Sequence, residues 1–168
     1  CLLLSTLQSF GNEVYGIDID SISIKKAKQR GLNNVYCMDI KDYIVEQKKQ
    51  GIKFDVITIF DVLEHLVNPL EILVNLKHLL SREGTIVGTV PNGKRFLRDY
   101  ITTDFPPHHF YRFNNKSITE ILNRASFSVD KIKIIEYGYT GKAIIKLMFN
   151  KIKLTFKKEC QFQANENP

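Results

Sequence analysis

The sequence contains little of what stabilises a small extracellular domain or spans a membrane. Its 168 residues include no tryptophan and only three cysteines, which are widely spaced and form no CxxC pair. This pattern indicates neither a disulfide framework nor a structural zinc site, and it favours a reducing, cytoplasmic compartment. No apolar run approaches the ~20 residues that cross a bilayer. The apolar stretch at the start of the chain has no basic segment before it, unlike a signal peptide.

The composition is that of a folded domain. Hydrophobic residues make up 43% of the chain, enough for a real core. We expect a domain over residues 1–140, followed by a basic extension, or a last strand with a frayed tail, over 141–168. The whole chain has a net charge of +6. Six of its lysines lie in this C-terminal segment: Lys142, Lys146, Lys151, Lys153, Lys157 and Lys158. Because no aromatic RNA-binding motif accompanies them, nucleic acid is an unlikely partner and a solvated tail is favoured.

Strand-like and helix-like segments alternate along the chain. Strands are predicted over 14–17, 35–38, 54–60, 85–90 and 129–137, and helices over 2–10, 21–31, 41–50, 70–80 and 117–125. Ser21 is the predicted cap of the second helix, and Cys37 is expected in the core. The strand 54–60 is almost continuously apolar, as expected for a strand buried on both faces of a parallel sheet. The alternation predicts an α/β fold with a doubly wound, mostly parallel sheet.

Acidic residues follow three predicted strands. Asp18, Asp39 and Asp61 each stand where a strand ends, and Pro91-Asn92 ends a fourth. Ligands of doubly wound sheets bind outside the carboxyl ends of the strands. A carboxylate accepts hydrogen bonds only, so it suits ribose hydroxyls or an adenine amino group. For any single acid, a role as helix N-cap is an equally good interpretation.

Five stretches, in order, carry a family resemblance: EVYGIDID (13–20), NNVYCMDI (33–40), FDVITIFDVLEHLVNP (54–69), GTIVGTVPN (84–92) and PPHHFYRF (106–113). They resemble class I S-adenosylmethionine-dependent methyltransferases, above all the subfamily that includes ubiquinone-biosynthesis O-methyltransferases. The resemblance implies a Rossmann-like fold, S-adenosylmethionine as cofactor and a small-molecule acceptor, with transfer to oxygen favoured. It leaves the oligomeric state open.

The resemblance also implies cofactor-binding residues, all of them near strand ends. It assigns Asp18 to the ribose hydroxyls, Ile19 to the adenine face, Met38, Asp39 and Ile40 to the adenine, and Phe60 and Asp61 to the methionine portion.

The first part of the family pattern has no counterpart in this sequence. The family opens with a strand and a Gly-x-Gly loop, whereas this sequence opens with the apolar segment 2–10, which resembles the helix after that loop. We therefore expect an N-terminally truncated domain that lacks the first strand and glycine loop and is inactive alone. The alternative function is a non-catalytic fragment unable to bind cofactor by itself. A dinucleotide-dependent oxidoreductase is disfavoured, because no hydride-transfer constellation is present.

Histidines are the candidate catalytic bases. His65 belongs to Asp61-x-x-Glu64-His65, and on a helix this spacing places all three side chains on one face. In the ubiquinone-pathway enzymes the corresponding stretch is associated with a divalent metal that helps bind a catechol-like acceptor. We favour the interpretation that Glu64 and His65 cap a helix and line the pocket over the metal interpretation. His108 and His109 lie in an irregular insertion that is typical of a substrate lid.

Overall fold

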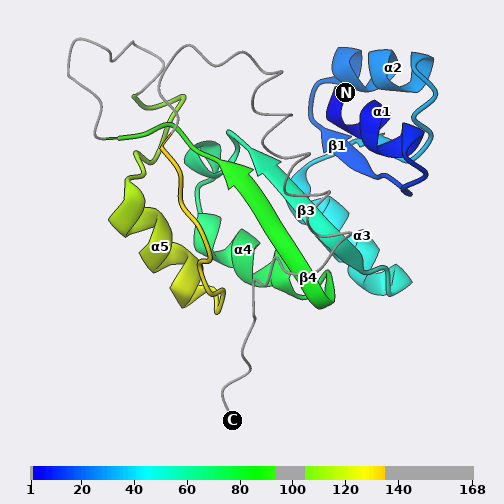
Figure 1. Cartoon of the computed structure of the whole chain (residues 1–168). Helices are drawn as coiled ribbons and strands as arrows, with labels where there is room; N and C mark the ends of the chain where they lie inside the picture. The colour runs from blue at the N-terminus through cyan, green and yellow to red at the C-terminus, as the bar shows by residue number, and fades with distance from the viewer. Residues whose placement is uncertain (1, 94–104, 135–168) are drawn as a thin grey trace. The chain divides into compact units, whose positions relative to one another are not determined.

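The computed structural model describes residues 2–93 and 105–134 and divides the chain into two compact units, Cys1–Gly51 and Ile52–Pro168 (Figure 1). The proposed boundary between a domain over 1–140 and an extension over 141–168 lies outside the described residues. It stays a prediction.

The first unit contains three helices and a pair of parallel strands. Its elements are α1 (Leu2–Ser9), β1 (Gly16–Asp18), α2 (Ser21–Gln29), β2 (Val35–Cys37) and α3 (Ile40–Gln50). Strand β1 pairs with β2 in parallel register, so Asp18 lies opposite Cys37. A small core forms beside this pair from Val14, Ile24, Ala27, Leu32 and Val35, with Leu4 and Leu7 packed against it.

Acidic residues are the N-caps of two helices in this unit. Asp20 caps α2 by accepting hydrogen bonds from the N–H groups of Ile22 and Ser23, so the prediction of Ser21 as the cap is wrong. A carboxylate satisfies two N–H groups at once, and its charge suits the positive end of the helix dipole. Asp39 caps α3, which ends at Gly51 with a left-handed φ of 68°.

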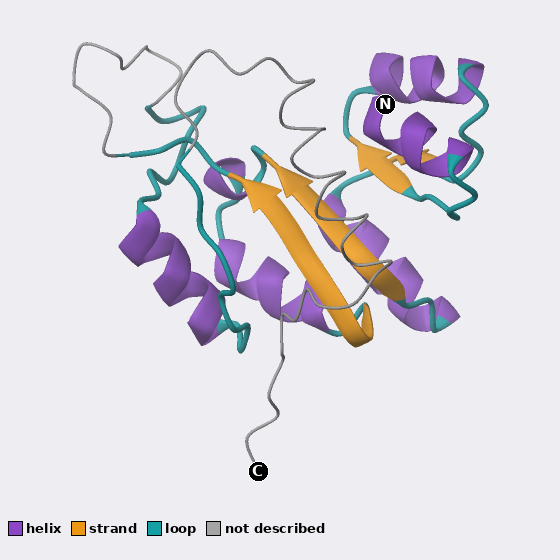
Figure 2. Ribbon diagram, viewed as in Figure 1, coloured by secondary structure: helices purple, strands orange, loops and turns teal. Residues whose placement is uncertain are grey.

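The second unit is built around a longer parallel pair (Figure 2). Its elements are β3 (Phe54–Phe60), the 3-10 helix η1 (Leu63–His65), α4 (Pro69–Lys77), β4 (Leu80–Thr89) and α5 (Asn115–Arg124). Strands β3 and β4 run side by side, with Phe60 opposite Thr89 at their carboxyl ends. Helix α4 packs against α5 and buries Ile72, Leu73 and Leu76.

Three local predictions differ from the structure. Helix α4 stops at Lys77 and β4 already begins at Leu80, because Leu80 pairs with Phe54 at the start of β3. Residues 129–134 of the predicted last strand form no regular secondary structure, and 135–137 lie outside the described residues. Cys37 is exposed rather than in the core, because only Val35 of β2 is buried.

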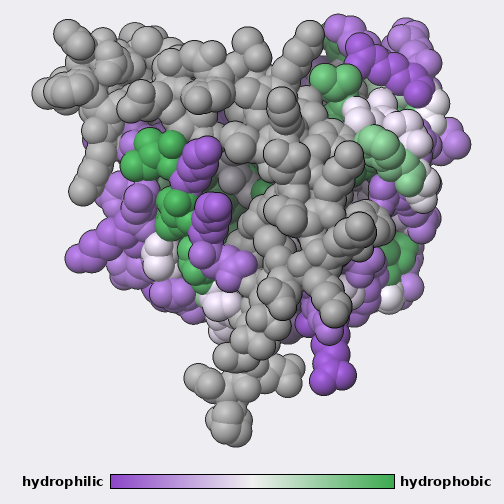
Figure 3. All heavy atoms as spheres, viewed as in Figure 1, coloured by the Kyte–Doolittle hydropathy of each residue, from purple (hydrophilic) through white to green (hydrophobic). Residues whose placement is uncertain are grey.

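The fold-class prediction is confirmed. Within residues 2–93 and 105–134, both named strand pairs are parallel, and helices connect the strands, as in a Rossmann-like α/β fold. Among these described residues, the helices are too short or too polar to cross a membrane. On the face drawn in Figure 3, hydrophobic side chains of the described residues form separate small groups among hydrophilic ones.

Candidate functional site

The carboxyl end of β3 is held to β4 by two hydrogen bonds at Asp61. Its N–H donates to the carbonyl oxygen of Thr89 at 3.0 Å, and its Oδ1 accepts a bond from Thr89 Oγ1, also at 3.0 Å. Asp61 adopts a left-handed φ of 49°, which is unfavourable for a residue other than glycine. Such strain occurs where the surrounding structure imposes it, often at functional sites.

The next turn, η1, presents the imidazole of His65. Its Nδ1 lies 2.7 Å from the backbone carbonyl oxygen of His108. A carbonyl oxygen only accepts hydrogen bonds, so Nδ1 must carry the hydrogen. In the neutral ring the lone pair is therefore on Nε2, where it can take a proton or bind a metal ion.

Glu64, the residue before His65 in η1, is almost completely buried. Its exposed fraction is 1%, and among the described residues neither carboxylate oxygen has a hydrogen-bond partner. Burial raises the pKa of the Glu64 carboxyl, and the Asp61 carboxylate acts in the same direction. A buried carboxylate without partners is costly unless it is protonated or neutralised by a cation.

Residues 105–113, which we call the aromatic segment, are anchored to η1. The N–H groups of Phe110 and Tyr111 both donate to the carbonyl oxygen of Glu64, at 2.8 and 3.3 Å. Tyr111 Oη donates to the carbonyl oxygen of Val67 at 3.0 Å. Phe113 is buried and pairs with Asn92 just beyond β4. These bonds fix the segment against the end of the strand pair.

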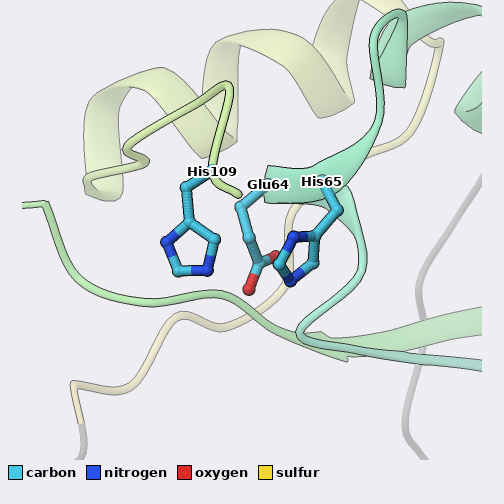
Figure 4. Close-up of side chains that lie close together, drawn as sticks. All are labelled: Glu64, His65 and His109. Atoms are coloured by element: carbon cyan, nitrogen blue, oxygen red, sulfur yellow. The ribbon is translucent and has the colours of Figure 1, made fainter. Parts of the chain in front are cut away.

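Because the aromatic segment is anchored in this way, the imidazole ring of His109 lies next to that of His65. The two ring centroids are 4.7 Å apart with an angle of 68° between the ring planes. Glu64, His65 and His109, which we call the donor cluster, have ligand atoms within 4.8 Å of one another. Figure 4 shows the Glu64 carboxylate lying between the two imidazoles.

The predicted helical face of Asp61, Glu64 and His65 does not form. The 3-10 helix covers only Leu63–His65, and the backbone of Asp61 is left-handed. The structure thus brings together two of the three histidines proposed as bases. The third, His108, has an exposed side chain and contributes its carbonyl oxygen.

Five of the predicted cofactor-binding residues lie at the strand ends of the first unit. The N–H of Met38 donates to the Asp18 carbonyl oxygen at 3.1 Å, which joins the two strand ends. The Asp18 carboxylate accepts the N–H of Asp20, and Ile19 beside it is 79% exposed. Asp39 caps α3 through the N–H of Lys41, and Ile40 is the first residue of that helix. The capping interpretation therefore holds for Asp39, while Asp18 caps no helix.

Thr89 is the residue that sequence reasoning missed. It is the last residue of β4, directly before Val90 and Pro91, and both its hydroxyl and its carbonyl bind Asp61. The sequence feature that could have identified Thr89 is a hydroxyl side chain at the end of β4, the strand that pairs with β3.

Comparisons with known proteins agree with this geometry. The sequence profile of the methyltransferase domain family matches residues 2–132. A ubiquinone biosynthesis O-methyltransferase of Actinobacillus pleuropneumoniae is 32% identical over 106 residues, which cover 60% of this chain and 44% of that protein. The corresponding enzyme of Haemophilus ducreyi is 28% identical over the same shares. The chain thus spans less than half the length of these curated relatives.

A solved structure shows the same fold. The crystal structure of a SAM-dependent methyltransferase from Archaeoglobus fulgidus superposes with a TM-score of 0.60 at 20% identity, over 95% of this chain and 76% of that one. Together with the profile match over residues 2–132, this establishes that the chain belongs to the methyltransferase domain family, with the class I S-adenosylmethionine-dependent methyltransferase fold.

Proposed function

We propose that this protein transfers a methyl group from S-adenosylmethionine to a hydroxyl oxygen of a small molecule. The observation that carries the proposal is the donor cluster at the carboxyl end of β3, in a chain of a methyltransferase family. The relatives named as ubiquinone biosynthesis O-methyltransferases support oxygen as the accepting atom. The resemblance to the ubiquinone-pathway enzymes favours a catechol-like compound as the acceptor.

The residues proposed to bind the cofactor fit its chemistry. In the first unit, the Asp18 carboxylate is exposed at the end of β1 and is suited to the ribose hydroxyls. The exposed Ile19 side chain offers an apolar surface for the adenine ring, and Met38, Asp39 and Ile40 follow the neighbouring strand. In the second unit, Phe60 is the last residue of β3 and Asp61 follows it, and both are proposed for the methionine portion.

Methyl transfer is an in-line displacement, so the protein supplies alignment and a route for the acceptor proton. When bound, S-adenosylmethionine supplies a methyl group on a sulfonium sulfur, which leaves as a thioether with the electron pair of the broken carbon–sulfur bond. The acceptor oxygen forms the new bond to carbon and must lose its proton. We assign this loss to the donor cluster, where His65 carries the Nε2 lone pair.

Cofactor binding tests the first half of the proposal. We expect isothermal titration to show that Asp18→Ala weakens binding of S-adenosylmethionine by about 10-fold or more, since a hydrogen bond to a charged group contributes about 1.5–3 kcal/mol. Asp42→Ala is the matched control, because Asp42 is also exposed but lies in α3 beyond the cap. Equal affinities of the wild type and Asp18→Ala would contradict the cofactor assignment. No binding by the wild type would favour the non-catalytic interpretation.

Methyl transfer tests the second half. Because residues 1–168 alone are expected to be inactive, the assay uses the chain joined to the strand and glycine loop with which the family opens, and we expect a labelled methyl group to appear on a catechol-type acceptor. Transfer to an amine probe with none to the catechol would refute the assignment of oxygen.

A further inference from the structure

We propose that Thr89 is a positioning residue for the cofactor, and that its hydroxyl holds the Asp61 carboxylate in the orientation that binds the amino-acid end of S-adenosylmethionine. The inference rests on the proposed function, because it uses the assignment of Asp61 to the methionine portion. It adds a residue of β4 to a site that the sequence placed at the end of β3. Thr89 acts through Asp61 and is not itself a ligand of the cofactor.

The first argument is that one residue holds both the backbone and the side chain of Asp61. The Asp61 N–H donates to the carbonyl oxygen of Thr89, and Thr89 Oγ1 donates to Asp61 Oδ1, both at 3.0 Å. Hydrogen bonds to an ionised acceptor are stronger than those between neutral groups. The two bonds, made to a strand that pairs with β3, therefore favour one rotamer of the Asp61 side chain.

The second argument is that this carboxylate keeps an oxygen for a ligand. Asp61 is exposed at the carboxyl end of β3, the edge of the sheet where ligands of this fold bind. Among the residues that the structure describes, Oδ1 accepts the Thr89 hydroxyl, whereas Oδ2 accepts no hydrogen bond. The left-handed backbone at Asp61, with a φ of 49°, is strain of the kind found at functional sites.

The third argument is the close approach of the two strands directly before Thr89. Gly88 lies opposite Ile59, and a Cβ atom at position 88 would lie 2.6 Å from the carbonyl oxygen of Ile59. Real Cβ atoms essentially never come this close to another atom, so a larger residue would push the strands apart. Glycine at this position therefore permits the strand separation at which the hydroxyl of Thr89 reaches Asp61.

The chemistry of the cofactor explains why this orientation matters. The amino-acid end of S-adenosylmethionine carries an ammonium group, which is positively charged and only donates hydrogen bonds. A carboxylate is negatively charged and only accepts them, so the two groups suit each other. A carboxylate already held by Thr89 loses less side-chain freedom when the cofactor binds, and such preorganisation strengthens binding.

The test compares two ligands that differ at the amino-acid end. S-adenosylhomocysteine has this end, whereas methylthioadenosine lacks it and keeps the adenosine and the sulfur. In the extended chain of the methyl-transfer assay, Thr89→Val should weaken binding of S-adenosylhomocysteine about 3- to 10-fold, the range expected when a ligand must immobilise one more side chain. Isothermal titration should show little change for methylthioadenosine. Thr89→Ser keeps the hydroxyl and should bind both compounds as wild type does.

Two controls make the test specific to the bond between Thr89 and Asp61. Thr85 lies on the same strand, and its buried hydroxyl has no hydrogen-bond partner among the described residues. Thr85→Val is thus the same chemical change without the bond, and it should leave both affinities unchanged. In an Asp61→Asn background, which removes the charge, Thr89→Val should cause no further loss for S-adenosylhomocysteine, because the effects of residues in contact are not additive.

The orientation of the Asp61 side chain is measured without any ligand. In nuclear magnetic resonance, three-bond couplings to its carboxyl carbon should report a single rotamer in wild type and in Thr89→Ser. The same couplings should report averaging over several rotamers in Thr89→Val. Averaging in wild type would overturn the proposal, and this result does not require any variant to fold.

The outcomes separate this inference from the proposed function. If Asp18→Ala weakens binding of both compounds but Thr89→Val weakens neither, the cofactor site stands and the positioning role of Thr89 is refuted. An equal loss for both compounds in Thr89→Val would show that Thr89 is only structural. If wild type binds neither compound, the proposed function fails and this inference fails with it.

Discussion

His65 Nδ1 lies 2.7 Å from the backbone carbonyl oxygen of His108, which is 43 residues further along the chain. The contact joins the turn after β3 to the aromatic segment and determines which ring nitrogen of His65 carries the lone pair. Because the partner is a main-chain atom, the contact does not depend on the side chain at position 108.

This contact predicts unequal roles for the two histidines. His65→Ala should lower the rate of methyl transfer by about 100-fold or more, as expected when a group that handles the acceptor proton is lost. His108→Ala should leave the rate within a few-fold, because it keeps the carbonyl. Nitrogen NMR of the His65 ring should report hydrogen on Nδ1 in both wild type and His108→Ala. A loss of this tautomer in His108→Ala would show that the side chain matters.

The bond between Thr89 and Asp61 predicts a specific loss of stability. Thr89→Val keeps the shape and strand propensity of the side chain but removes the donor to Asp61 Oδ1. The free energy of unfolding should fall by about 0.5–1.5 kcal/mol, the usual contribution of one hydrogen bond. Thr89→Ser keeps the hydroxyl and should retain more of this contribution. Urea denaturation measures both, and equal stability of the two variants would contradict the assignment.

The end of α5 predicts a stabilising substitution. Ser126 follows this helix with a left-handed φ of 62°, and its N–H donates to the carbonyl oxygen of Asn123 at 2.8 Å. Glycine adopts this conformation without steric cost, so Ser126→Gly should raise the free energy of unfolding by about 0.5–1 kcal/mol. Ser126→Ala retains the strain and should give no gain. Thermal unfolding of both variants checks this, and a gain from alanine would refute the explanation by strain.

Burial of Tyr43 predicts a dependence of stability on alkaline pH. Burial raises the pKa of the Tyr43 hydroxyl, which has no hydrogen-bond partner among the described residues. The folded state therefore holds this proton more tightly than the unfolded state, so stability is highest below the usual tyrosine pKa of about 10 and falls above it.

The variant Tyr43→Phe isolates this effect. At neutral pH it should be as stable as wild type or slightly more stable, because it removes an unpaired buried hydroxyl. Between about pH 10 and pH 11 it should lose less stability than wild type. Urea denaturation at both pH values measures the difference. The same alkaline loss in wild type and variant would exclude Tyr43 as its source.

The order of the elements from α1 to α5 was predictable from sequence, and the first three strands end within one residue of their predicted ends. Residues 54–60 form β3 as expected, because a continuous apolar run between polar turns is a local signal of a buried strand. Helix capping by Asp39, which the sequence offered as an alternative to cofactor binding, is also a local feature, because it involves an acidic residue directly before a helix. Side chains close in sequence carry these features, so the pattern of neighbours is sufficient to predict them.

The sequence also named His65 and His109 as site residues, but only the tertiary structure joined them. Helical spacing placed Asp61 with Glu64 and His65, whereas pairing between β3 and β4 directs Asp61 to Thr89. His109 reaches the donor cluster because the backbone of the aromatic segment binds the carbonyl of Glu64. Such contacts depend on strand register and main-chain hydrogen bonds between distant segments, which local periodicity does not encode.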